Sequence, residues 1–170
     1  MPVKINDTLN VTGDIVASGS IQFQETTARL SIPAAAFEVT SPSSAYYVNN
    51  GFDLGNQRTD QNENFVAPVY LPDGAKVSKV TMYYNSQNSE QISLSLARSP
   101  HGGATSETIA TGSSQSGSGG TELTLDTDYT TISNENNSHR IFATMPKKND
   151  AGSSATLLYE VVIEYTRIAP

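Results

Sequence analysis

Two glutamates near the end of the chain, Glu160 and Glu164, have the spacing that places two carboxylates on one face of a β-strand. Such a pair, with one carboxyl held in a pocket that raises its pKa, is the chemistry of a glycoside hydrolase. The same residues also fit the polar outer face of a strand whose other face is buried. No motif around them selects the catalytic interpretation, so we expect no catalytic residue and rank a small hydrolase as the weakest of three hypotheses.

Residues that serve as metal ligands or bases are few and scattered. The chain has 2 histidines, His101 and His139, which we expect at the surface, and no cysteine. This excludes disulfides, thiolate zinc sites and a cysteine nucleophile. Calcium takes roughly six to eight oxygen ligands, and neither acidic group of the chain has a spacing that fixes such a cage. We therefore expect no cofactor, with calcium as the alternative at Asp126 with Asp128, or at Asp53, Asp60, Glu63 and Asp73.

Tyrosine is the most frequent aromatic residue, with 8 in the chain. An exposed tyrosine with Asn or Gln neighbours stacks on a sugar ring and hydrogen-bonds its hydroxyls. Tyr83 falls opposite the apolar face of its strand, and Tyr47 does so if Tyr46 points inward. Tyr47 and Tyr83 are therefore the candidate contacts for a glycan or a partner, and the alternative is that both are half-buried strand residues.

The charge balance restricts the partners. The chain carries a net charge of −7, and only 16% of its residues are charged, against about 25% in an average domain. No basic run is longer than Lys147-Lys148, so the positive surface that phosphate binding requires is missing. We expect neither nucleic acid nor an anionic membrane as a partner. A polar, uncharged surface is typical of β-rich extracellular and virion proteins.

The first residues lack the positive and apolar regions of a secretory signal, and no run approaches the ~18 apolar residues of a membrane span. We therefore expect a processed fragment, or a protein that leaves the cell without a signal, as virion proteins do at lysis. The expected location is the virion or the extracellular space, without membrane insertion.

The segments that must position these residues have the pattern of β-strands. Apolar residues alternate with polar ones over 76–84 and 92–96, and these runs, joined by 85–89, predict a hairpin. The run 155–168 predicts a long central strand with Leu157, Tyr159, Val161, Ile163 and Tyr165 on one face. Segment 111–121 consists only of Gly, Ser, Thr and Gln and predicts a mobile loop. With roughly seven to nine short strands, the predicted fold is an all-β antiparallel sandwich or jelly roll.

A near-repeat with a six-residue period stands close to the start of the chain. Val11 to Ile15 reads VTGDI, and Ala17 to Ile21 reads ASGSI. A solenoid needs about three repeats to bury a core, so we expect identical chains, wound around a shared axis, to supply the missing part. Residues 1–33 therefore predict an oligomerisation stalk and 34–170 a β-sandwich head. The predicted stalk interface comprises Leu9, Val11, Ile15, Ile21 and Phe23, and the best helical stretch, a short one, is 25–32.

These repeats, followed by Gln22 to Thr27, resemble the stalk segments of trimeric bacteriophage tail fibres and related fibrous adhesins. The resemblance covers only the N-terminal part of the chain. A second segment, Phe65 to Tyr84, resembles a β-sandwich domain of poorly characterised secreted bacterial proteins. This second resemblance implies a fold and a location, and it carries no active residues across.

The sequence therefore predicts a non-enzymatic structural or attachment protein, a homotrimeric virion fibre, spike or capsid-decoration component. Its expected partners are further copies of itself, and other virion proteins or a cell-surface glycan. The alternative is a secreted bacterial carbohydrate-binding or adhesin module that acts as a monomer.

Overall fold

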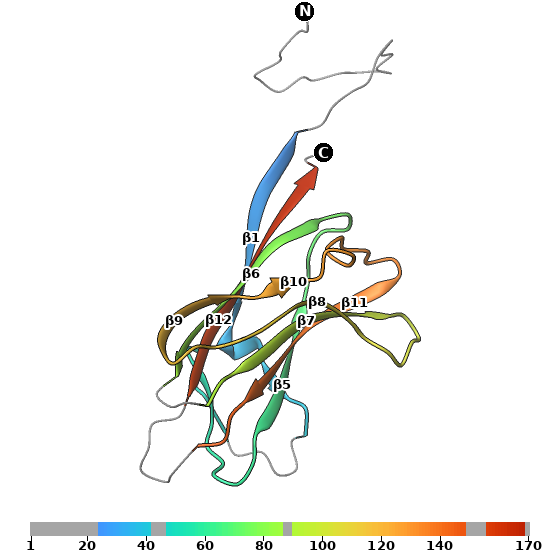
Figure 1. Cartoon of the computed structure of the whole chain (residues 1–170). Coiled ribbons are helices and arrows are strands. Elements are labelled where there is room, and N and C mark those ends of the chain that lie inside the picture. Colours follow the sequence, from blue (N-terminus) through green and yellow to red (C-terminus); the bar gives the residue numbers. More distant parts are fainter. Residues whose placement is uncertain (1–23, 42–46, 87–89, 149–155, 169–170) are drawn as a thin grey trace, which may run out of the picture.

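The computed structural model describes residues 24–41, 47–86, 90–148 and 156–168, which form two antiparallel β-sheets packed face to face (Figure 1). The predicted all-β sandwich is confirmed. In the described ranges the strands are β1 (Glu25–Pro33), β2 (Glu38–Val39), β3 (Tyr47–Asn49), β4 (Leu54–Asn56), β5 (Glu63–Val69), β6 (Lys76–Ser86), β7 (Ser93–Pro100), β8 (Glu107–Ser113), β9 (Gly117–Glu122), β10 (Thr124–Leu125), β11 (Asn137–Met145) and β12 (Leu157–Ile168).

Each sheet contains six strands. Sheet A has the order β3-β4-β12-β6-β9, and β1 pairs with β12 on the side that β4 uses. Sheet B has the order β10-β8-β7-β11-β5-β2. Among the described residues the helical part is one 3-10 turn, Ala34–Ala36, and no helix there is long and apolar enough to cross a bilayer.

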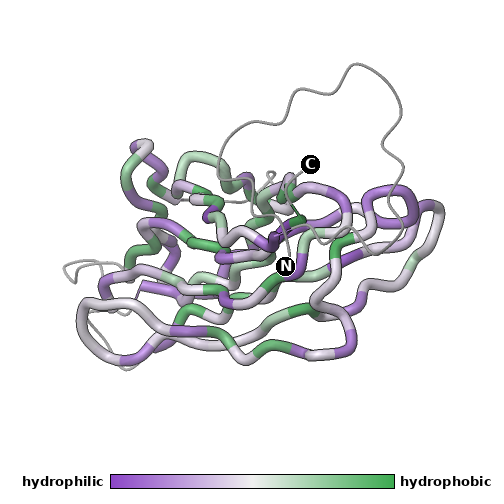
Figure 2. Tube along the Cα trace, turned by 90° about the horizontal axis from the view of Figure 1, so that it is seen from above, coloured by the Kyte–Doolittle hydropathy of each residue, from purple (hydrophilic) through white to green (hydrophobic). Residues whose placement is uncertain are grey.

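The core lies between the sheets and is built by strict alternation along their strands. Figure 2 shows hydrophobic and hydrophilic residues succeeding each other along the chain. On β11, for example, Ile141, Ala143 and Met145 are buried while the residues between them are not. The largest fully buried side chains come from both sheets and are Phe37, Phe65, Leu54, Met82, Ile92, Leu94, Leu96, Ile109, Ile132, Ile141, Met145 and Leu158.

The predicted hairpin of 76–84 with 92–96 is wrong. β6 pairs with β12 and β9 in sheet A, whereas β7 pairs with β11 and β8 in sheet B. Each strand has one apolar face, and both faces are buried in the core between the sheets, although the strands belong to different sheets. Period-two alternation reports which side chains are buried and does not identify the neighbouring strand.

The predicted loop 111–121 is also wrong, because much of it is strand. Residues 107–113 form β8, and Gly117–Glu122 form β9, which pairs with β6 from Thr81 to Ser86. Ladder hydrogen bonds come from the backbone, so a glycine-rich segment can pair when a long neighbouring strand fixes its register. The side-chain composition contains no signal for this pairing.

β12 is a central strand, as predicted, but its face pattern changes at a register shift between Leu158 and Glu160. Leu158 is fully buried, and Tyr159, predicted on the buried face, is 36% exposed. Val161, Ile163 and Tyr165 then continue the buried face. Because of this bulge, the predicted buried face of β12 is wrong at the start of the strand and right from Val161 onward.

The segment 25–32 is strand rather than helix. β1 pairs along its whole length with β12, from Glu25 opposite Ile168 to Pro33 opposite Glu160. Together they extend beyond the rest of the sandwich as a two-stranded ribbon (Figure 1). The part 25–33 of the predicted stalk is therefore hydrogen-bonded to the last strand of the same chain. The predicted interface residues, Leu9 to Phe23, lie outside the described residues, and their role stays a prediction.

Candidate binding groove

The outer face of sheet B carries the candidate site. β11 lies between β5 and β7, with Arg140 opposite Pro68 and Ala97 and with Phe142 opposite Val66 and Ser95. The inward residues of these strands form the core, so Arg140 and Phe142 project from the other side of the sheet. Strand alternation thus places a row of non-core side chains across neighbouring strands.

Four hollows of about 520, 420, 410 and 140 Å³ lie on this face. The two largest share His101, Ser138 and Arg140 in their linings. Phe142 joins the largest to the smallest, and Thr111 joins the smallest to the remaining one. The four hollows therefore adjoin one another in a row, and together they are called the groove. It spans from β5 to β10, which at ~4.8 Å between strands is about 19 Å across the sheet.

Small hydroxyl side chains are the most frequent type in the lining of the groove, which also contains the aromatic rings of Phe142 and Tyr70. Phe142 is half-buried in the middle of the sheet, and Tyr70, at one end of the groove, is 82% exposed. The hydroxyl residues of the lining are Ser93, Ser95, Ser99, Thr105, Ser106, Thr108, Thr111, Thr124, Ser138 and Thr144. A surface of this kind offers donors and acceptors in many directions together with two apolar faces.

The wall around His101 is held by hydrogen bonds that His101 donates to the loop before β11. The His101 backbone N–H donates to Asn136 O at 2.9 Å, and its ring Nε2 lies 3.1 Å from Asn134 O. Because a carbonyl only accepts, the ring donates there. Asn134 is fixed in turn, since its N–H donates to Asp73 Oδ1 at 2.7 Å and its Nδ2 donates to Leu71 O at 2.8 Å. This end of the groove is preorganised by backbone contacts.

The two histidines do not share one environment. His101 is exposed, as predicted, but His139 is only 4% exposed, so its predicted surface location is wrong. Its Nε2 has no hydrogen-bond partner in the described part of the chain. Burial lowers the pKa of His139, and the positive charges of Arg98 and His101 lower this pKa further. His139 therefore favours the neutral form.

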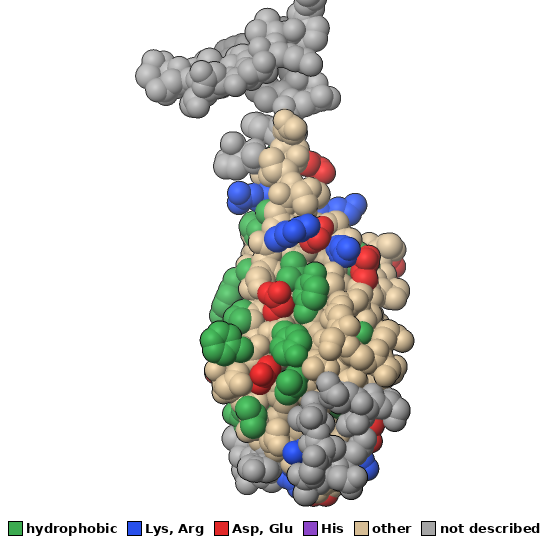
Figure 3. Space-filling model, turned by 90° about the vertical axis from the view of Figure 1, so that its left-hand side faces the viewer, with side chains coloured by type: hydrophobic (Ala, Val, Ile, Leu, Met, Phe, Trp, Pro, Cys, Tyr) green, Lys and Arg blue, Asp and Glu red, His purple; other side chains and the backbone are tan. Residues whose placement is uncertain are grey.

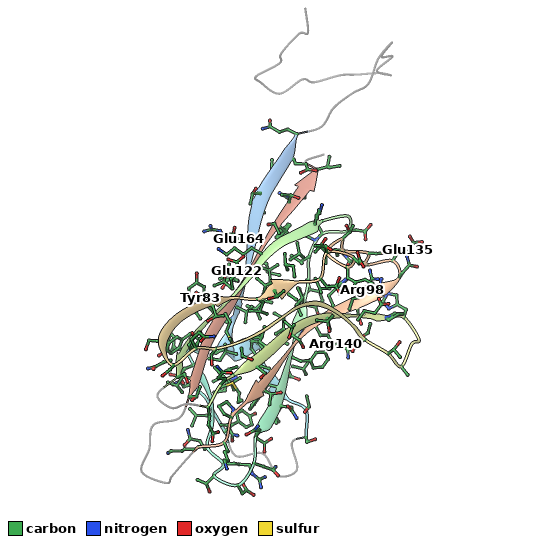
Figure 4. The ribbon with its side chains drawn as sticks, in the orientation of Figure 1. Tyr83, Arg98, Glu122, Glu135, Arg140 and Glu164 are labelled. Carbon is green, nitrogen blue, oxygen red and sulfur yellow. The ribbon has the colours of Figure 1, made fainter. Side chains whose placement is uncertain are left out.

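Tyr83 and Tyr47, the predicted glycan contacts, are not brought together, and neither lines the groove. Tyr83 is 40% exposed on the outer face of sheet A, opposite Glu160 of β12. In Figure 4 it lies on the other side of the molecule from Arg140. The Tyr47 ring meets the buried Phe65 ring edge to face, with centroids 5.2 Å apart. The role of both tyrosines in ligand contact stays a prediction.

The glutamates of the weakest hypothesis lie on the same outer face of sheet A, as the spacing predicted. Ser31 Oγ donates to Glu160 Oε2 at 2.6 Å, and Arg29 Nη2 lies 3.1 Å from Glu164 Oε1. Figure 3, which shows this side of the molecule, has acidic side chains interspersed with hydrophobic ones. Each carboxylate has a partner on β1, which is the arrangement of a polar strand face.

The two acidic groups considered for calcium are used in turns and ion pairs. Asp126 Oδ1 accepts the N–H of Asp128 at 3.1 Å, which closes a turn. Asp60 accepts two hydrogen bonds from Arg58, which hold the pKa of its carboxyl down to about 2. In the described ranges no three His, Asp or Glu residues lie close enough together to hold a metal ion.

The sequence interpretation missed Phe142 and Tyr70, although a signal was present. In the run Arg140 to Met145, the buried positions are Ile141, Ala143 and Met145, so Phe142 is an aromatic residue on the polar face. Tyr70 likewise follows the outward positions of β5. What the sequence could not indicate is that β11 lies between β5 and β7, which brings these residues to one groove.

Comparison with known proteins found similar solved structures and no family. No protein-family model matches the chain, and no curated protein matches it. One similar solved structure is the CBM36-1 domain of a multidomain xylanase from the hindgut metagenome of Trinervitermes trinervoides, with a TM-score of 0.43, 18% identity and coverage of 80% of this chain and 96% of that one. A second is a family 11 carbohydrate-binding module from Clostridium thermocellum in complex with a β-1,3-1,4-mixed-linked tetrasaccharide, with a TM-score of 0.40, 15% identity and coverage of 86% of this chain and 90% of that one. A third is the cyanophage Pam1 capsid asymmetric unit, with a TM-score of 0.40, 20% identity and coverage of 95% of this chain and 99% of that one. At these identities and TM-scores the likeness concerns the β-sandwich alone.

Proposed function

We propose that this chain is a non-catalytic binding module that holds a carbohydrate chain in the groove of sheet B. The observation that carries the proposal is the row of four adjoining hollows on one sheet face, which share Arg140, Phe142 and Thr111 in their linings. Sugars present hydroxyls around an apolar ring face. Serine and threonine hydroxyls form hydrogen bonds with the sugar hydroxyls, and aromatic rings such as Phe142 and Tyr70 pack on the apolar face of the sugar ring.

Other ligand classes fit the groove less well. A peptide that adds a strand needs an open sheet edge, whereas the groove crosses the face of strands that are already paired on both sides, such as β11 and β7. A nucleic acid needs several cations along its path, and among the described residues that line the four hollows the only Lys or Arg is Arg140. The same linings contain a single carboxylate, Asp126, where glycoside hydrolysis requires two.

The test uses the intact chain and a glycan array followed by isothermal titration with the best ligand. Substitution F142A removes the central ring and is expected to weaken binding by roughly tenfold, as for a central contact residue. Y70A removes the exposed ring at the end of the groove and is expected to weaken binding less. F142L, which keeps apolar bulk, separates ring stacking from a loss of folding. Y83A is the matched control, since Tyr83 lies on the opposite sheet. Binding that Y83A abolishes and F142A spares would overturn the groove proposal and favour sheet A.

A second candidate function, assembly into a trimeric fibre or spike, is favoured by one observation. β1 and β12 extend together beyond the sandwich (Figure 1), and β1 is the last part of the predicted stalk, directly after the predicted interface residues. Three chains joined there would present three grooves, so weak contacts would add through effective concentration. We further propose a virion or extracellular location, where other virion proteins or a cell-surface glycan are the partners.

Light scattering on the full chain tests assembly. Substitution I15D or I21D is expected to convert a trimer into a monomer, whereas S20D, a polar position of the same repeat, should leave the trimer intact. Truncation before Phe37 is a poorer test, because it also removes β1 from β12. A monomeric wild-type chain, or a trimer that survives both Ile substitutions, would contradict the stalk hypothesis.

A further inference from the structure

Arg140 differs from most other described arginines because it makes no ion pair or hydrogen bond in the described ranges. Arg29, Arg58 and Arg98 each contact a carboxylate, at 3.1, 2.6 and 2.7 Å respectively. Arg167 is also without a partner among the described residues, but it stands near the end of β12, on the extended ribbon. Arg140 instead occupies the middle of sheet B, in a strand paired on both sides.

The surroundings of Arg140 contain few negative charges. The two large hollows that it lines include no Asp or Glu side chain of the described ranges. The one carboxylate of the four linings, Asp126, belongs to the hollow at the β10 end of the groove. Asp73 is held by the backbone of Asn134. Glu135 stands in the loop before β11 (Figure 4) and lines none of the four hollows. In a chain of net charge −7, the linings of the two large hollows therefore contain the Arg140 cation and no carboxylate of the described ranges.

We propose that Arg140 forms a subsite for an anionic substituent of the bound carbohydrate, a sugar carboxylate or a sulfate ester. This inference rests on the proposed function. The guanidinium offers a planar set of donors that bonds two oxygens of one anion at once. Phe142 lies two residues along the same strand and Tyr70 at the end of β5, so a sugar stacked on either ring brings its substituent toward Arg140.

The test compares neutral, carboxylated and sulfated glycans on one array, with the intact chain as the probe. We expect the wild-type chain to bind carboxylated or sulfated glycans more strongly than neutral ones. Whichever of the two anionic classes binds identifies the substituent. R140Q should weaken binding of those glycans by roughly tenfold or more and change binding of neutral ones by less than about twofold. R140K keeps the positive charge but loses the planar guanidinium, so its affinity for the anionic glycans should lie between those of the wild type and R140Q.

R167Q is the matched control, because it removes the same charge from a second arginine, one that lies outside the groove. It should bind as the wild type does. If neutral glycans bind as well as anionic ones, in a manner that F142A weakens, the anionic subsite is overturned and the groove proposal stands. If R140Q and R167Q reduce binding equally, the effect is net charge and the subsite is again overturned. If no glycan of any class binds, both proposals fall.

Discussion

The ring of Tyr83 lies directly over Gly120 of the neighbouring strand. A Cβ built on Gly120 would come within 3.0 Å of Tyr83 Cε1 and 3.2 Å of Cδ1. The two residues are register partners in the β6–β9 pair. A tyrosine thus covers the glycine of an edge strand that has few side chains of its own, which explains how the segment 117–122 is held in sheet A.

The first prediction follows from this contact. G120A should lower the free energy of unfolding relative to G119A by about 0.5–1 kcal/mol, because the added methyl must displace the ring. Gly119, one residue away, serves as the control, since a Cβ added there would meet nothing within 4 Å. Urea denaturation of both variants, alone and combined with Y83A, measures the effect. A G120A cost that persists unchanged in the Y83A background would show that the ring is not its cause.

The second prediction tests the bulge in β12. L158A should destabilise the fold by about 2–5 kcal/mol, since Leu158 is fully buried. Y159A should cost much less, because that side chain is 36% exposed. Thermal unfolding of the two neighbours distinguishes this register from regular alternation, in which Tyr159 would be the costly position.

The third prediction concerns pH. The pKa of His139 in the folded chain lies below its ordinary 6.5. Between that folded pKa and about pH 6.5, His139 is therefore mostly protonated in the unfolded chain and mostly neutral in the folded chain. The stability contributed by neutral His139 is complete above about pH 6.5 and is lost as pH falls from there through its folded pKa. H139L should therefore flatten the stability profile between about pH 7.5 and 5.5, as measured by urea denaturation. H101Q, which alters the exposed histidine, should keep most of the wild-type slope, because burial is the main cause of the lowered His139 pKa and the charge of His101 a smaller one. An unchanged slope in H139L would refute the prediction.

The fourth prediction concerns Asp60. Arg58 Nε and Nη2 donate to its two oxygens at 2.8 and 2.6 Å, and this bidentate contact lowers the pKa of Asp60 from 3.8 to about 2. A lowered carboxyl pKa means that the contact supports the fold above about pH 3.8 and is lost as pH falls toward 2. Carboxyl carbon NMR titration should give a midpoint near 2 in the wild type and a higher one in R58K, which keeps the charge without the fork. A wild-type midpoint near 3.8 would contradict the observed geometry.

Much of the fold was predictable because burial imposes a period of two on the sequence. The alternation in 76–84 and 92–96 identified strands and their buried faces, and the position of Tyr83 on the outer face followed from it. Composition likewise argued against nucleic acid as a ligand through the net charge of −7. Alternation is a property of each segment by itself, and net charge is a sum over the whole chain. Neither depends on which strands are neighbours.

Strand pairing was decided only by the tertiary structure. Alternation says nothing of the partner, so β6 and β7 were expected in one hairpin and lie in different sheets. A glycine-rich segment was expected as a loop and pairs with β6, because the backbone alone makes the ladder. The groove arises in the same way. Tyr70, Arg140 and Thr111 come from three segments far apart in sequence, and only the order of sheet B brings them to one surface.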